Sequence, residues 1–180
     1  MKTRHLLMAC ALPALFAACK KDSNNKPSQS TLADNTVAFT LDGKAYTTAG
    51  LDLSTASVKD QEVVDQRDSL YVLTGVTSPS ANAGQITLSV TFRKGQVTTG
   101  NYGDTAYASD GINWTPNLGG EDFYQSTTAH YSVIQITKAD GQILEGTFSG
   151  EVAATTNQDN VLKITGGQFR INLATVAKGN

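Results

Sequence analysis

The stretch ITLSVTFR, residues 86–93, alternates apolar and polar side chains without interruption. Its large apolar members stand at every second position: Ile86, Leu88, Val90 and Phe92. Successive side chains of a β-strand point to opposite faces of the sheet, whereas a helix repeats its apolar positions every three or four residues. The stretch therefore predicts a strand with one buried face and one face in water.

The same two-residue period continues through most of the chain after residue 36. Further strands are predicted over residues 36–41, 45–48, 51–58, 70–77, 131–138, 143–153, 161–165 and 168–174. Asp-Gly pairs at 42–43 and 140–141 separate neighbouring strands, and such pairs favour tight hairpin turns. The charged segment 59–69 predicts a solvated loop between two of the strands.

The longest predicted strand illustrates the two faces. Leu144, Phe148 and Val152 share one side of it. Glu145 and Glu151 lie on the other side. Antiparallel sheets commonly pack one face on the core and leave the other in water. We therefore expect the three apolar residues in the core and the two carboxylates on the surface.

These patterns predict an all-β protein with about eight or nine strands and no helix after the N-terminal segment. Short strands joined by regular turns are typical of an antiparallel β-sandwich or a β-barrel. Both folds bury alternate residues of every strand, so the period does not choose between them, and we slightly prefer the sandwich. Residues 36–180 are predicted to form a single domain, because a chain of this length can bury one core without disulfides or metals to stabilise it.

The N-terminal segment has the three parts of a secretory signal peptide. Lys2 and Arg4 give a basic start, and an almost wholly apolar run over residues 6–18 follows. This run contains Pro13 and is shorter than the ~20 apolar residues that cross a bilayer. Small residues then precede Cys19, an arrangement that resembles a bacterial lipoprotein signal, in which the cysteine is acylated. An ordinary secretory cleavage beside a chance cysteine is the alternative.

We therefore predict that residues 1–18 are a signal peptide that is removed and that Cys19 carries the lipid. Residues 19–35 are polar and contain Pro27, a composition that cannot bury enough apolar area to order itself. They predict a flexible tether between the membrane and the domain. The expected location is the outer membrane, with the domain facing either the periplasm or the cell surface.

The composition of the mature chain argues against nucleic acid as a partner and against an intrachain disulfide. Loss of Lys2 and Arg4 leaves 12 of the 14 Lys+Arg against 16 Asp+Glu, a formal net charge of −4. Such a chain has no basic patch for nucleic acid. Its remaining cysteine is the one that lipidation would consume. No intrachain disulfide is therefore expected, and packing and hydrogen bonds must hold the fold together.

Three motifs carry a resemblance to a known group of proteins. They are FTLDGKAY at 39–46, GTF at 146–148 and ITGGQF at 164–169. Together with the N-terminal cysteine and polar tether, they resemble the small single-domain lipoproteins of Bacteroidetes, over roughly residues 36–173. That group has an early DGK-aromatic hairpin and late GTF and T-x-G-x-F strands. The motifs are turn and packing motifs, so the resemblance implies a lipid-anchored domain and transfers no activity.

Residues 100–125 interrupt the alternation and are rich in aromatic side chains. The candidate ligand-facing residues are Tyr102, Tyr107, Trp114, Phe123 and Tyr124. Exposed aromatic rings beside hydrogen-bonding groups suit the flat apolar faces of sugars or a peptide groove. The alternative is that these rings cover the open end of the core, since buried aromatics contribute large apolar areas. A buried Trp114 would favour that structural role.

Residues for catalysis or metal binding are sparse. His130 opens a predicted strand, and it is read as an ordinary strand or rim residue. Glu121 and Asp122 are adjacent carboxylates, but neighbours on a strand point to opposite faces, whereas acid–base catalysis needs convergent groups. No pattern predicts a metal, a cofactor or a catalytic constellation.

The sequence thus predicts a lipid-anchored envelope domain that acts as a binding or structural module. Its partner, besides the membrane that holds the lipid, would be a glycan or an envelope protein. The alternative function is a small envelope hydrolase with a carboxylate site near Glu121 and Asp122. Convergence of those carboxylates in a deep cleft would favour the hydrolase.

Overall fold

A computed structural model describes residues 32–59, 67–80, 82–103 and 110–179. Cys19, the signal segment 1–18, most of the tether and Tyr107 lie outside the described residues. The described part is all-β, as predicted. Its elements are β1 (Thr36–Leu41), β2 (Lys44–Thr47), β3 (Gly50–Lys59), β4 (Arg67–Val76), β5 (Gln85–Phe92), the short turn η1 (Arg93–Gly95), β6 (Gly100–Tyr102), β7 (Gly111–Thr115), β8 (Tyr124–Gln125), β9 (Ser132–Ala139), β10 (Ile143–Ala154), β11 (Val161–Asn172) and β12 (Ala177–Lys178).

The strands of the described residues form one continuous sheet of 12 strands. Along the main path the order is β12-β3-β4-β5-β7-β8-β10-β11-β1-β2, and β9 pairs with β10 and β6 beside this path. Neighbouring strands are antiparallel except β12 and β3, which are parallel. The strand count exceeds the expected eight or nine because β6, β7, β8 and β12 are two to five residues long, too short to show a period.

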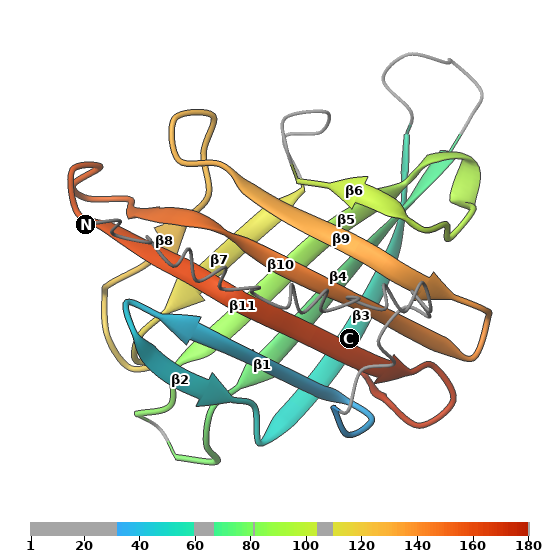
Figure 1. Cartoon of the computed structure of the whole chain (residues 1–180), viewed down its shortest axis with the longest axis horizontal. Coiled ribbons are helices and arrows are strands. Elements are labelled where there is room, and N and C mark those ends of the chain that lie inside the picture. Colours follow the sequence, from blue (N-terminus) through green and yellow to red (C-terminus); the bar gives the residue numbers. More distant parts are fainter. Residues whose placement is uncertain (1–31, 60–66, 81, 104–109, 180) are drawn as a thin grey trace, which may run out of the picture.

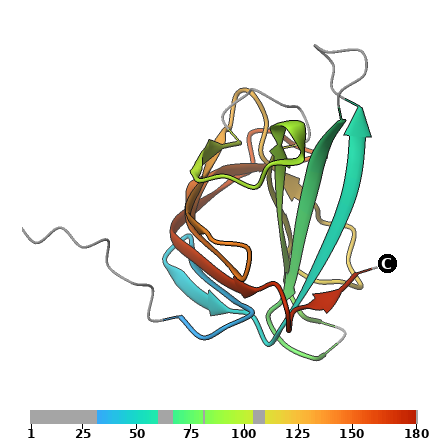
Figure 2. The same cartoon turned by 90° about the vertical axis from the view of Figure 1, so that its right-hand side faces the viewer.

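The sheet folds over so that its two halves face each other. β3, β4 and β5 form one layer, and β9, β10, β11 and β1 cross it at a steep angle in the other (Figure 1). Figure 2 shows the space between the layers from the side. The layers resemble those of a sandwich, but hydrogen bonds run from one to the other through β7 and β8. The sheet is open, because its end strands β12 and β2 do not pair with each other.

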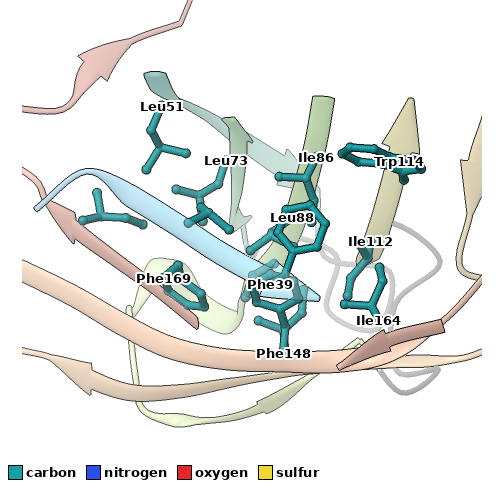
Figure 3. Packing of buried hydrophobic residues seen from close by; sticks show 14 of the residues in the cluster. Phe39, Leu51, Leu73, Ile86, Leu88, Ile112, Trp114, Phe148, Ile164 and Phe169 are labelled. Atoms are coloured by element: carbon teal, nitrogen blue, oxygen red, sulfur yellow. The ribbon is translucent and has the colours of Figure 1, made fainter. Parts of the chain in front are cut away.

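Buried apolar side chains from both layers fill this space. The four alternate residues of the stretch 86–93 are all buried, with exposed fractions of 0% to 1%. Figure 3 shows Ile86 and Leu88 of β5 facing Phe39 of β1 and Phe148 of β10 across the core. The two-residue period of the sequence thus identified the core face of this strand correctly.

The final strand is longer than the sequence indicated. We expected separate strands at 161–165 and 168–174, but β11 runs unbroken through Gly166 and Gly167. An extra residue of β11 lies opposite both β10 and β1, which makes a β-bulge at this point. Gly166 has φ +60°, a conformation that glycine adopts at little cost. The bulge lets the strand bend while keeping its pairing on both sides.

Glycines and phenylalanines face each other between β10 and β11. Gly146 is paired with Phe169, and Gly167 is paired with Phe148. A Cβ atom at Gly146 would overlap the Phe169 ring, and one at Gly167 would come within 2.6 Å of the Phe148 ring. Each ring therefore lies over the glycine of the opposite strand. The GTF and T-x-G-x-F motifs are the two halves of this reciprocal packing.

Glu145 corrects one expectation about the long strand. Its side chain was expected in water, but the residue is only 6% exposed and its carboxylate forms an ion pair with Arg170. Arg170 is the neighbour of Glu145 across the strand pair, and it also binds Asp34 at 2.6 Å. The polar face is covered here because the chain entering the domain lies against it. Glu151, on the same side further along, is half-exposed.

The last residues of the predicted tether are attached to the sheet. Asp34 accepts hydrogen bonds from Asn172 at 3.0 Å and from Arg170 at 2.6 Å. These side-chain hydrogen bonds hold the pKa of Asp34 below its ordinary value. Asn35 accepts the Asn172 backbone N–H at 2.9 Å and donates to Thr175 at 3.0 Å. The ordered domain therefore starts before residue 36.

The hairpin between β3 and β4 extends into the charged segment that was predicted as a loop. Lys59 pairs with Arg67, and residues 60–66 between them lie outside the described residues. Asp68 is only 1% exposed, and it accepts the backbone N–H of Lys94 at 2.9 Å. A carboxylate is buried only where hydrogen bonds compensate its desolvation.

No helix in the described part of the chain is long and apolar enough to cross a bilayer.

Candidate functional site

Trp114, the central candidate of the aromatic region, is a core residue. It is 2% exposed, and its ring centroid lies 5.6 Å from that of Phe39 and 5.2 Å from that of Tyr46. Figure 3 shows the indole beside Ile86, its partner across the β5–β7 pair. This corrects the prediction of a ligand-facing Trp114, because the short strand β7 turns the ring inward. The alternative role, closing the end of the core, fits its position.

The other aromatic candidates divide between core and surface. Tyr124 is 8% exposed, and its hydroxyl accepts a hydrogen bond from Asn160 at 3.0 Å, so it is not ligand-facing either. Phe123 is 37% exposed, at the end of the loop between β7 and β8, where Leu118 is 46% exposed. Tyr107 lies outside the described residues. Among the four described candidates, Tyr102 is the one that lines the pocket described below.

Tyr102 is held in place from two sides. Its ring packs edge-on against Phe92 with centroids 5.2 Å apart. Its hydroxyl donates to the backbone carbonyl of Thr98 at 2.9 Å and lies 3.0 Å from the Thr98 hydroxyl. The side chain is half-buried. Because these contacts already hold the side chain, a ligand that binds the other face of the ring would cost little further side-chain entropy.

The pocket lies at one end of the folded sheet and has a volume of ≈ 330 Å³. It is formed where β5 ends, η1 turns back and β6 begins, the region at the top of Figures 1 and 2. Its lining is Thr91, Arg93, Lys94, Gln96, Thr98, Gly100, Asn101, Tyr102 and Asp110. The volume falls at the lower end of the range for small-molecule sites.

A tight turn builds one wall of the pocket. Lys94 and Gly95 have φ values of +56° and +66°, and the backbone N–H of Gln96 donates to the Arg93 carbonyl at 3.0 Å. Two successive central residues with positive φ define a type I′ turn. The buried carboxylate of Asp68 accepts the Lys94 N–H from beneath. The turn is thereby fixed to β4, which pairs with β5 over this length.

Both signs of charge line the pocket. Arg93 and Lys94 are basic and exposed, and Asp110 is acidic and half-buried. Asn101 and Gln96 add amide groups that donate and accept hydrogen bonds. Apart from Tyr102, none of these residues was predicted from the sequence to face a ligand. Lys-Gly after a strand is a weak turn signal, and the position of Asp110 beside it depends on the pairing of β5 with β7.

The candidate carboxylates and His130 lie outside the pocket. Glu121 and Asp122 are exposed in the loop between β7 and β8, and neither lines the pocket. His130 is half-buried just before β9, and its Nδ1 lies 3.1 Å from a carboxylate oxygen of Glu151. Within the described ranges, no three His, Cys, Asp or Glu side chains gather as metal ligands would. The pocket is therefore the site whose geometry best suits a ligand.

No protein-family model, no curated protein and no solved structure matches this chain.

Proposed function

We propose that this protein is a lipid-anchored cell-envelope module that binds a glycan unit in the pocket between β5, η1 and β6. The observation that carries the proposal is the lining of this pocket, which combines amides, hydroxyls, charged groups and one supported tyrosine ring. Sugars present hydroxyl groups around an apolar ring face, so they suit amide donors and acceptors beside an aromatic side chain.

The position of the pocket supports an anchored role. The described chain starts beside β11, and β10 and β9 separate that start from β6; in Figures 1 and 2 the start of β1 lies low in the domain and β6 lies at its top. Asp34 and Asn35 fix that start to β11. A lipid on Cys19 would therefore attach to the domain on the other side of β9, β10 and β11 from the pocket. The pocket would face away from the membrane, where envelope glycans could reach it.

Binding rather than catalysis is proposed. The hydrolase alternative depended on Glu121 and Asp122, which are exposed and apart from the pocket. A partner protein in place of a glycan would need a larger contact area than this pocket provides, since stable protein interfaces bury more than ~1,000 Å².

The test uses the mature chain, residues 19–180, with Cys19→Ser to keep it in solution. Binding to a panel of envelope glycans is measured by glycan array and then by calorimetry. Asn101→Ala should weaken binding about 5-fold to 10-fold, because one hydrogen bond to the ligand is lost. The matched control is Asn82→Ala, an exposed asparagine outside the pocket, which should bind as the parent does. Equal affinities for the two variants, or no glycan binding, would refute the proposed function.

A further inference from the structure

Lys94 occupies a backbone position that does not suit lysine. Its φ of +56° and ψ of +23° lie in the left-handed region, where the Cβ atom crowds the following carbonyl and where glycine, asparagine or aspartate is the usual residue. A type I′ turn demands this conformation at its first central position, and Gly95 meets the demand at the second. The surrounding structure must therefore hold Lys94 in place.

Asp68 supplies one restraint. Its carboxylate is buried beneath the turn and accepts the Lys94 backbone N–H at 2.9 Å. Residues kept in sparsely populated conformations cluster at ligand sites, where the strain is part of the function. A glycine at position 94 would make the same turn and the same backbone hydrogen bond without strain. Turn formation therefore gives no reason for a lysine at this position.

The pocket does give such a reason. Lys94 lines it, and no acidic side chain in the described part of the chain forms an ion pair with the Lys94 ammonium group. Arg93 adds a second basic residue to the same wall, and Asp110 contributes one acidic residue. A ligand with one carboxylate and several hydroxyl groups suits this lining, because the carboxylate can pair with the Lys94 ammonium group and the hydroxyls can bind amides such as that of Asn101.

We propose that Lys94 is the specificity-determining residue of the pocket and that the ligand is an acidic sugar, a hexuronic acid unit of a glycan. The Lys94 ammonium group would pair with the sugar carboxylate, and the Asn101 amide would bind its hydroxyls. This inference rests on the proposed glycan function and narrows it to one class of sugar. The strained turn is then the means by which the charge is held at the pocket wall.

The experiment compares D-glucuronate with D-glucose as probes, using the mature chain with Cys19→Ser. The parent should bind glucuronate at least 10-fold more tightly than glucose. That preference should weaken as salt rises from 0.05 to 0.5 M, because salt screens exposed charge pairs. The Debye length is about 10 Å at 0.1 M and shortens as salt is added. Lys94→Gly should abolish the preference, because the affinity for glucuronate should fall to about that for glucose.

Stability provides an independent readout. Lys94→Gly should raise Tm by about 2–4 °C, since glycine relieves the left-handed strain. Lys94→Asn, which also tolerates this conformation, should lose the preference in the same way. The charge-matched control is Lys163→Gln, an exposed lysine of β11 outside the pocket, which should keep both affinity and preference.

The outcomes separate the two proposals. Retention of the glucuronate preference in Lys94→Gly overturns the role of Lys94, and so does a parent that binds glucose as tightly as glucuronate. In either case the glycan function stands, because the pocket still binds sugar and Asn101→Ala still weakens it. A parent that binds neither probe nor any glycan of the panel removes both proposals. A lowered Tm in Lys94→Gly contradicts the strain argument and overturns the inference.

Discussion

At the scale of single residues, Trp114 shows how one side chain closes the core. Its indole meets Phe39 and Tyr46 edge to face, and aromatic pairs at such distances add to the energy of simple burial. Gly84 lies against the indole so closely that a Cβ atom there would overlap the ring. Lys44 lies 5.0 Å from the centroid of the Tyr46 ring on the outer side. The exposed strand β2 is thereby packed onto the core.

Replacing Trp114 with alanine should cost about 3–5 kcal/mol of unfolding free energy, the range for large buried aromatic residues. In the parent, tryptophan emission should be blue-shifted and protected from acrylamide, since the indole is 2% exposed. Urea unfolding and fluorescence quenching measure both effects. Phe123→Ala is the control. Because Phe123 is 37% exposed, its replacement should lower the free energy of unfolding far less. Red-shifted, readily quenched emission would contradict a core position for Trp114.

At the scale of elements, the β10–β11 pair explains why the GTF and T-x-G-x-F motifs of this chain depend on each other. Gly146 and Gly167 leave space that Phe169 and Phe148 fill from the facing strand. Glycine within a strand has no side chain to pack, so the facing ring compensates for what the glycine lacks. The bulge at Gly166 lies directly beside one of these pairs. Packing and bending of the central strands are thus set by the same short motif.

Gly146→Ala should destabilise the fold by about 1–3 kcal/mol, because the new Cβ overlaps the Phe169 ring and the Gln135 carbonyl of β9. The free energy of unfolding in urea measures the loss. Gly119→Ala serves as the control, since a Cβ there meets only the Asn117 side chain at 3.6 Å. Similar stabilities for the two variants would show that the aromatic–glycine packing is loose.

The β9–β10 turn has a measurable pH dependence. Asp140 accepts the backbone N–H groups of Ile143 at 2.7 Å and Gln142 at 3.0 Å, and its other oxygen lies 3.1 Å from the Lys138 ammonium. These contacts lower the pKa of Asp140 to about 2 from 3.8. Because the folded pKa is depressed, the carboxylate stabilises the fold fully above pH 3.8, and the contribution is lost as pH falls towards 2.

A carboxyl ¹³C titration by NMR should therefore place the Asp140 midpoint near pH 2. Asp140→Asn keeps one oxygen acceptor but removes the charge. The difference in unfolding free energy between parent and variant should be present at pH 5 and should shrink as the pH approaches 2. A difference that stays constant over this interval would mean that the charge of Asp140 does not support the turn.

At the scale of the whole molecule, one layer of the folded sheet separates the chain start from the pocket. The chain enters beside β11, where Asp34 and Asn35 are bound, and the pocket lies beside η1 and β6, across β10 and β9. In Figures 1 and 2 the start of β1 lies low in the domain and β6 lies at its top. This arrangement would suit the proposed domain, held by its N-terminal segment on one side and binding on the other.

Cys19→Ser in the full chain should release the protein from membranes, because the proposed lipid would be its only strong attachment. A single acyl chain binds reversibly, and stable anchoring takes more than one lipid signal. Membrane fractionation after a salt wash, with metabolic labelling by a fatty acid, measures the effect. Cys10→Ser is the control and should stay on the membrane. A serine variant at position 19 that remains bound would contradict lipid anchoring.

The sequence alone determined the all-β class, the core face of β5 and the hairpin at Asp42-Gly43, where φ is positive at both residues. These features are local, because a period of two and a turn pair depend only on neighbouring residues. Tertiary structure decided the rest: the burial of Trp114, the Glu145–Arg170 pair and the pocket beside Lys94. Each depends on which distant strands pair and how the sheet bends, and short strands such as β7 carry too few residues to specify their partners alone.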